Sequence, residues 1–304
     1  MIIPIALFAY KRVEHLTKAL EGLQVNRIPL VYAFSDGAKN PEDQPFVNEV
    51  REIIRAIDWC EVQIFEREKN YGLGKSIRAG VTQVLEKHEQ VIVVEDDIVL
   101  RPGAYDYAVS ALRHYRNDPR VMSVTMWSHP SLVPFGARNG FFSKRFVCWG
   151  WGTYADQWKK FKGTPLEIYK ECETRGVDVL KWGQDLKYQA ETAEERNLWY
   201  VGFALTHFLE NCVSYVPSET LTVNIGFDGS GENCGFVPVD TDLATKPVAL
   251  PDRWPLVGVR HGQARRFAGY FTKKRPLIIR IKKRIINELQ KSNFLRTLWH
   301  KLRN

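Results

Sequence analysis

The chain has 304 residues, of which 44% are hydrophobic and 26% are charged, and its formal net charge is +8. These proportions are ordinary for a globular protein and exclude a disordered or fibrous chain. The five cysteines are odd in number and form no CxxC pair, which argues against a disulfide framework or a structural zinc site and favours a reducing compartment. Because Met1–Pro4 has no basic start and no apolar run approaches the ~18 residues that span a bilayer, we expect neither a signal peptide nor a transmembrane helix.

The first 127 residues alternate between strand-like and helix-like segments. Apolar spacing predicts strands at 2–8, 29–34, 62–65, 91–97 and 121–126, and helices at 12–23, 45–57, 75–87 and 103–115. Units of this kind, each about thirty residues long, are typical of a doubly wound, parallel α/β sheet. The carboxyl ends of parallel strands meet at one edge of a sheet, so polar residues that follow successive strands are expected to converge there.

The regular alternation fades after residue 127. Residues 128–140, with two prolines and two glycines, predict a loop, and residues 180–209 predict a helical region. Residues 220–225 predict a strand, followed by a glycine-rich run, 226–231, that could close over a site. His207, on its helix, is interpreted as a core or surface histidine rather than a ligand.

The chain is organised around the segment 91–97. Four β-branched apolar residues, typical of a strand buried on both faces, run into Glu95, Asp96 and Asp97. Burying three unpaired charges costs too much free energy, so these acids are expected at the carboxyl end of the strand. Clustered carboxylates there suit a divalent cation that bridges to phosphate oxygens, and the alternative is a solvated strand exit.

Residues 146–154 form an aromatic and glycine-rich cluster. Glycine lets the backbone approach a ligand closely, and tryptophan offers a flat apolar face that suits a sugar ring. Trp149, Gly150 and Trp151 are therefore candidates for acceptor binding, and a packed core corner is the alternative.

Several stretches together resemble the nucleotide-sugar glycosyltransferases of the GT-A fold. They are residues 6–12, 35–37, 70–74 and 95–97, and the Trp149–Gly152 and Asn224–Phe227 segments recur in the same order. The resemblance covers residues 2–235 and is nearest to the N-acetylglucosaminyltransferase I-like group and its bacterial relatives that build surface polysaccharides. It implies a Rossmann-like, mostly parallel sheet flanked by helices.

The resemblance also implies residue roles. Asp97 would ligate Mn²⁺ or Mg²⁺, Arg12 would contact the diphosphate, and Asp36 would contact the nucleobase. Glu95 and Asp96 would lie at the ribose or base side. The remaining nucleotide-sugar-binding residues would be Phe8, Tyr10, Asn70, Gly72 and Lys75. Two alternatives stay open: Asp36 could be a turn residue of an Asp-Gly pair, and Lys75 an ordinary helix-start residue.

The sequence departs from the resembled group at two positions. Inverting transfer needs a general base near the acceptor hydroxyl. In the resembled group a carboxylate follows the tryptophan that matches Trp199, whereas no acid follows Trp199 here. We expect Asp185 to be this base, with Asp156, Glu195 and Asp228 as further candidates. The second departure is Glu232-Asn233-Cys234, where relatives often carry a histidine.

These observations predict a metal-dependent inverting glycosyltransferase that moves a sugar, expected to be UDP-linked, to a lipid-linked or cell-surface polysaccharide acceptor. Residues 1–127 would bind the nucleotide sugar, 128–255 the acceptor, and 256–304 a membrane. One alternative is a nucleotidyltransferase acting on sugar phosphates, which normally shows a glycine-rich loop directly after the first strand, whereas residues 8–12 contain no glycine. The other is a catalytically degenerate, membrane-docked scaffold.

The C-terminal segment carries the positive charge. Residues 273–304 hold eleven Lys or Arg and one acid, Glu288, a net of +10, which leaves −2 for the rest of the chain. Ile278, Ile281, Ile285 and Leu289 share one helical face. This pattern favours an in-plane helix on an anionic membrane surface over a nucleic-acid arm, so we expect a cytoplasmic protein, peripheral on the inner face of the cell membrane, with no nucleic-acid partner. A helix packed against protein is the alternative.

Overall fold

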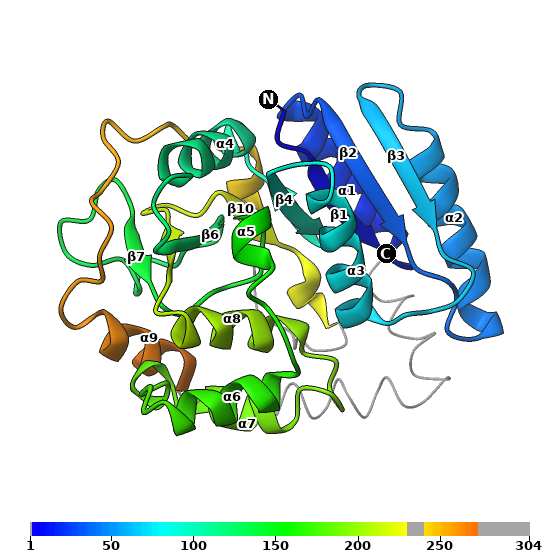
Figure 1. Ribbon diagram of the computed structural model, residues 1–304. Coiled ribbons are helices and arrows are strands. Elements are labelled where there is room, and N and C mark those ends of the chain that lie inside the picture. Colours follow the sequence, from blue (N-terminus) through cyan, green and yellow to red (C-terminus); the bar gives the residue numbers. More distant parts are fainter. Residues whose placement is uncertain (1, 230–239, 273–304) are drawn as a thin grey trace.

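The computed structural model describes residues 2–229 and 240–272. Its centre is an eight-stranded sheet with the strand order β3-β2-β1-β4-β8-β6-β9-β7 (Figure 1). The strands are β1 Ile5–Ala9, β2 Leu30–Ser35, β3 Glu61–Glu66, β4 Gln90–Glu95, β6 Val121–Thr125, β7 Phe141–Ser143, β8 Trp151–Tyr154 and β9 Val213–Val216. A separate antiparallel pair joins β5 Ile98–Leu100 to β10 Thr222–Asn224.

Most strands of the large sheet run in one direction. β3, β2, β1 and β4 are parallel neighbours. β8 is antiparallel to both β4 and β6, so β6 and its parallel neighbour β9 run the same way as β4. Only β8 and the edge strand β7 run in the opposite direction within this sheet. The predicted α/β fold class, with a Rossmann-like, mostly parallel sheet flanked by helices, is confirmed, and the predicted C-terminal helical tail lies outside the described residues.

Helices cover both faces of the sheet because side chains alternate along each strand. On β4, Ile92 and Val94 join one core cluster and Val91 and Val93 join the other. The first cluster is covered by α1 Val13–Val25, α2 Gln44–Arg55 and α4 Ala104–Tyr115. The second is covered by α3 Leu73–Leu85, α5 Ala155–Trp158 and α8 Trp199–Leu209, with α6 Pro165–Thr174, α7 Asp185–Glu191 and α9 Gln263–Thr272 outside them. Short 3₁₀ turns are η1 Pro41–Asp43, η2 Leu180–Trp182, η3 Gly226–Asp228 and η4 Thr241–Thr245.

The strands and helices predicted before residue 127 are confirmed, with ends that differ by a few residues. The prediction of one helical region over 180–209 is wrong, since η2, α7 and α8 are separate there. Gly183 (φ 148°) and Asn197 (φ 54°) lie in the two breaks, with backbone angles that a helix does not contain. Across residues 2–229 and 240–272, no helix has the length and apolar character needed to cross a membrane.

Candidate functional site

The carboxyl ends of β1, β2 and β4 lie side by side at one edge of the sheet. In register, Phe8 pairs with Glu95 on one side of β1, and Ala9 pairs with Ser35 on the other. Residues 10–12, Asp36 and residues 96–97 follow these strand ends directly. The structure therefore brings together the residues that the sequence predicted at this edge.

An ion-pair cluster stands at the end of β4. The Arg12 guanidinium contacts the Asp96 carboxylate, and its Nη2 lies 2.9 Å from Asp97 Oδ2. The Tyr10 backbone N–H donates to Asp96 Oδ2 at 3.3 Å. The side chains are 22% exposed for Arg12, 5% for Asp96 and 11% for Asp97. Burial alone would lower the pKa of Arg12, but the two carboxylates together raise it above its usual range.

Negative charge exceeds positive charge within this cluster. Burial, Asp97 and Asp96 raise the pKa of Glu95 to about 8, and burial raises the pKa of Asp96 against the pull of Arg12. Three carboxyl groups thus share one guanidinium. A further cation at this edge would relieve their mutual repulsion, because a bound ion reverses the local cost of ionising a carboxylate.

Asp97 is held against a glycine from a distant part of the chain. The Asp97 carbonyl accepts from the Ile225 N–H at 2.9 Å, and a Cβ atom on Gly226 would lie 2.2 Å from Asp97 Oδ2. Two residues on, Asp228 Oδ2 lies 3.4 Å from His15 Nε2 on α1. This places a second carboxylate close in sequence to the residue that touches Asp97.

The residues present fit a metal that is bound together with a phosphate ligand. Among the described residues, no group of three or more His, Cys, Asp or Glu is arranged to hold an ion. A hard cation such as Mg²⁺, however, is commonly held by one or two carboxylates, with substrate phosphates and water completing its shell. Asp97, against which Gly226 packs, supplies such a carboxylate.

Asp36 anchors the loop between β3 and α3. Its carboxylate accepts from the backbone N–H groups of Tyr71 at 2.9 Å and Gly72 at 3.0 Å, and the residue is 6% exposed. Asn70 holds the same loop by donating to the Gly37 carbonyl at 2.7 Å and accepting from Gly72 N–H at 3.0 Å. These contacts make Asp36 and Asn70 supports of loop 70–74, and a nucleobase contact by Asp36 stays a prediction.

Asn197 was not among the residues predicted from the sequence. Its Oδ1 accepts from the Gly74 N–H at 3.1 Å, so the first turn of α3 is tied to the segment before α8. Its own backbone is left-handed (φ 54°), a conformation that asparagine tolerates better than most residues. An asparagine just before the apolar run 198–209 was the available signal.

Three predicted nucleotide-sugar-binding residues occupy different environments. Phe8 is 3% exposed and stacks on Phe34 with ring centroids 5.0 Å apart, so its side chain belongs to the core. The Tyr10 hydroxyl donates to Asp43 Oδ2 at 2.8 Å, and burial and this bond raise the pKa of Tyr10 to about 12. Lys75 is exposed in the first turn of α3.

The predicted acceptor residues also separate. Trp151 opens the central strand β8, is fully buried, and packs against Trp158 and Trp199, so its ring offers no surface to an acceptor. Gly150 turns the chain at φ 79°. Trp149 is half-buried and contacts the rings of Trp127 and Phe227.

The predicted general base, Asp185, is engaged in an ion pair. It begins α7, and both carboxylate oxygens accept from the buried Arg145 guanidinium, one of them at 2.9 Å. Gln189 Nε2 donates to Oδ2 at 3.1 Å. Of the further candidates, Asp156 lies 3.3 Å from Arg116, Glu195 is exposed, and Asp228 lies 3.4 Å from His15. Glu232, Cys234 and residues 273–304 lie outside the described residues.

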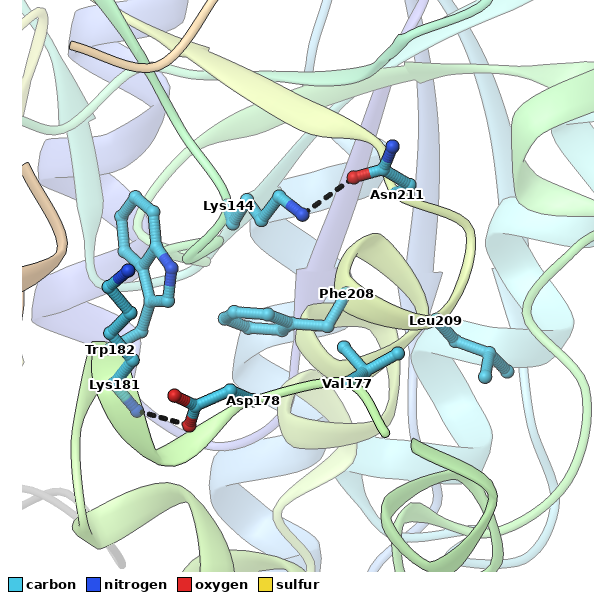
Figure 2. Close-up of a pocket in the computed structure, with 8 residues that line it drawn as sticks. All are labelled: Lys144, Val177, Asp178, Lys181, Trp182, Phe208, Leu209 and Asn211. Carbon is cyan, nitrogen blue, oxygen red and sulfur yellow. Dashed lines mark hydrogen bonds between the residues drawn. The ribbon is translucent and has the colours of Figure 1, made fainter. Parts of the chain in front are cut away.

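A cavity of about 420 Å³ lies elsewhere, beside the carboxyl end of α8 (Figure 2). Trp182 and Phe208 supply apolar surface, and Lys144 Nζ donates to Asn211 Oδ1 at 2.6 Å. The other lining residues are Val177, Asp178, Lys181 and Leu209. None of the predicted site residues lines it, so the strand-edge cluster remains the candidate site.

Comparison with known proteins gives only distant structural likenesses. No family model and no curated protein sequence matches the chain. A mannosyltransferase from Pyrobaculum calidifontis in complex with GDP-Man and Mn²⁺ aligns with 54% of this chain and 47% of its own, at 14% identity and a TM-score of 0.39. A UDP-glucose pyrophosphorylase complexed with UDP-glucose aligns with 74% of this chain and 94% of its own, at 12% identity and a TM-score of 0.40. A putative glucose-1-phosphate thymidylyltransferase from Bacillus anthracis aligns with 53% of this chain and 74% of its own, at 10% identity and a TM-score of 0.32.

TM-scores of 0.40 and below do not establish kinship. The chemistry of this chain therefore has to be argued from its own residues, and the narrower resemblance to the N-acetylglucosaminyltransferase I-like group stays a prediction.

Proposed function

We propose that this chain is a nucleotide-sugar-dependent glycosyltransferase of the inverting type. The observation that carries the proposal is Arg12, held by Asp96 and Asp97 at the carboxyl edge of the sheet. A guanidinium fork fixed in this way presents its remaining N–H donors to a diphosphate at the position where open α/β sheets bind ligands. The amino end of α1, which starts directly after Arg12, adds a favourable field for the same negative charge.

Asp97 would hold the divalent ion, Mn²⁺ or Mg²⁺. When bound, such an ion neutralises the developing charge of a diphosphate leaving group. Gly226 supports this role because only a residue without a side chain lets the backbone pack so closely against the Asp97 carboxylate. Loop 70–74, held by Asp36 and Asn197, would present backbone N–H groups and Lys75 to the same phosphates.

We assign the general base to Asp228 in preference to Asp185. An acceptor hydroxyl that attacks the anomeric carbon must lose its proton to a group within hydrogen-bond reach. Asp185 is committed to Arg145 and Gln189, whereas Asp228 stands two residues from Gly226, which touches Asp97. The His15 imidazole at 3.4 Å would orient the Asp228 carboxylate.

The rival function is nucleotidyl transfer, and the turn after the first strand argues against it. β1 ends at Ala9 and leads through residues 10–12 into α1 without a glycine, so it lacks the glycine-rich turn on which such enzymes place a nucleoside triphosphate. The lack of an acid after Trp199 was the reason for considering a catalytically degenerate scaffold. Asp228 offers another carboxylate for the role of general base.

The acceptor and the location belong to the same proposal. We propose a lipid-linked or cell-surface glycan acceptor, with residues 273–304 holding the protein at the anionic cytoplasmic face of the membrane. The full chain should sediment with phosphatidylglycerol vesicles, and the protein without residues 273–304 should not. Neither protein should sediment with phosphatidylcholine vesicles. Equal sedimentation of both proteins would contradict the membrane role.

The central test is release of nucleoside diphosphate from a panel of UDP- and GDP-sugars in the presence of Mn²⁺. Asp97→Ala should lower the release at least about a hundredfold, because one carboxylate supplies the protein's grip on the ion. Asp106→Ala, an exposed acid on α4, is the matched control and should leave it unchanged. Equal rates for both variants would rule out the role of Asp97, and pyrophosphate release from UTP and a sugar 1-phosphate would establish the rival function.

A further inference from the structure

We infer that five half-buried aromatic rings form a binding strip for an extended saccharide, the acceptor of the proposed transfer. The strip begins at Phe227, which follows the glycine that contacts Asp97. The strip consists of Phe227, Trp149, Trp127, His129 and Tyr270, each partly exposed. The inference rests on the proposed function, because it names the class of second substrate. Among these residues, the sequence pointed only to Trp149.

The rings contact one another in series from Phe227 to Trp127, and Trp127 then forms a mutually contacting group with His129 and Tyr270, whose ring centroid lies 6.1 Å from that of Trp127. Ring centroids are 5.2 Å apart for Phe227 and Trp149, 4.6 Å for Trp149 and Trp127, 6.2 Å for Trp127 and His129, and 4.7 Å for His129 and Tyr270. Trp127 and Trp149 are perpendicular, at 89°, so the edge of one ring meets the face of the other. Both rings are partly exposed, so aromatic surface remains available to a ligand.

Sheet topology places the strip next to the ion-pair cluster. Trp127 and His129 follow β6, whose carboxyl end lies at the same edge as that of β4. β8 lies between these strands and runs antiparallel, so Trp149, just before β8, falls at this edge as well. Phe227 follows Gly226, which contacts Asp97. The strip therefore extends from the proposed diphosphate site toward α9.

A polar group accompanies the rings. His129 Nδ1 accepts from the Ser131 N–H at 3.1 Å, and burial lowers the pKa of His129, so the neutral ring carries its proton on Nε2 and can donate it.

This combination fits a sugar chain better than a phosphorylated ligand. Flat rings pack against the C–H faces of sugars, and interspersed donors and acceptors meet their hydroxyls. The strip contains no Lys or Arg, and its histidine is kept neutral, so it offers no fixed cation to a phosphate. Five contacting rings offer more surface than one sugar ring covers, which indicates an acceptor of two or more units.

The test is retention of the full chain on an array of oligosaccharides built from hexoses, N-acetylhexosamines, deoxyhexoses and uronic acids, without any nucleotide sugar. The wild type should bind at least one oligomer more tightly than its monosaccharide. Trp127→Phe and Tyr270→Ala should each weaken that binding about tenfold or more. Phe46→Ala removes an exposed ring on α2 and should bind like the wild type.

The outcomes separate this inference from the proposed function. Failure of the wild type to bind any oligomer, or equal binding by the strip variants and the wild type, would overturn the strip. Nucleoside diphosphate release with water as acceptor needs only the donor site, so the strip variants should retain it. Loss of that release in Tyr270→Ala, with normal thermal unfolding, would also contradict a role confined to the acceptor.

Discussion

Gly226 lies directly against the carboxylate of Asp97, so that a Cβ atom there would stand 2.2 Å from Oδ2 and 3.1 Å from Arg12 Nη1. The two residues are far apart in sequence and meet because β10 pairs with β5 immediately after Asp97. In the proposed site, the small antiparallel sheet therefore places Gly226 against Asp97, the carboxylate that would hold the ion.

Gly226→Ala should remove activity without unfolding the protein. The added methyl group forces Asp97 or Arg12 to move, and a displacement of about 1 Å in a catalytic constellation can cost about a hundredfold in rate. Gly258→Ala is the matched control, because its Cβ would meet nothing within 4 Å. Nucleoside diphosphate release and thermal unfolding should be measured for both. Full activity of Gly226→Ala would show that the position of Asp97 is not critical.

Arg12→Met should destabilise the fold as well as the site. The substitution leaves Asp96 and Asp97 buried beside Glu95 without their cation, and breaking a buried ion pair costs roughly 3–5 kcal/mol. Urea unfolding measures the loss, with the exposed Arg265→Met as control. Adding Asp96→Asn to Arg12→Met should restore part of the stability. No recovery in the double variant would mean that charge repulsion is not the cause.

The strand-edge acids were predictable because the argument for them is local. A β-branched run that leads into three carboxylates is expected to end as a strand where the acids begin, and β4 indeed ends at Glu95. The pairing of the buried Asp96 and Asp97 with Arg12 was not visible in that local pattern. The central position of β8 was not predictable in the same way. Four residues, Trp151–Tyr154, become a strand through pairing with Val93 and Thr125, and neither partner is visible in the local pattern.

The prediction for Asp185 shows the same limit. It was expected to be the general base because no acid follows Trp199, but Arg145, forty residues earlier, forms a bidentate ion pair with it. Replacing Asp185 by Asn should therefore act mainly on stability, by leaving the buried guanidinium unpaired, whereas Asp228→Asn should lower turnover at unchanged stability. Urea unfolding and steady-state rates for the two variants distinguish the roles. The reverse pattern would return the base to Asp185.

Asn197→Ala should loosen loop 70–74. The variant loses the acceptor for Gly74 N–H and must hold a left-handed backbone with alanine, which costs about 1 kcal/mol. Asn211→Ala, also left-handed at φ 52°, controls for the backbone cost. Hydrogen exchange at Gly74 should be faster in Asn197→Ala alone, with a higher KM for the nucleotide sugar. Unchanged exchange at Gly74 would show that this hydrogen bond does not hold the loop.

The stability of the protein should depend on pH through a buried histidine outside the candidate site. His207, expected from the sequence to be a core or surface residue, is fully buried. Its Nδ1–H donates to the Phe203 carbonyl at 2.8 Å, and its Nε2 accepts from the Ser123 hydroxyl at 2.7 Å. Burial lowers the pKa of His207 to about 4, with the Phe203 bond opposing and Lys160 assisting.

The folded protein therefore binds this proton less readily than the unfolded chain, whose histidine has a pKa near 6.5. Above pH 6.5 His207 is neutral in both states and does not lower the free energy of unfolding. As the pH falls from 6.5 to 4, this histidine binds a proton in the unfolded state but not in the folded state. The free energy of unfolding should fall over this window by up to about 3 kcal/mol. His207→Gln should remove this component and the exposed His261→Gln should keep it, as measured by urea unfolding at half-unit pH steps. Parallel pH profiles for the wild type and His207→Gln would show that another group titrates there.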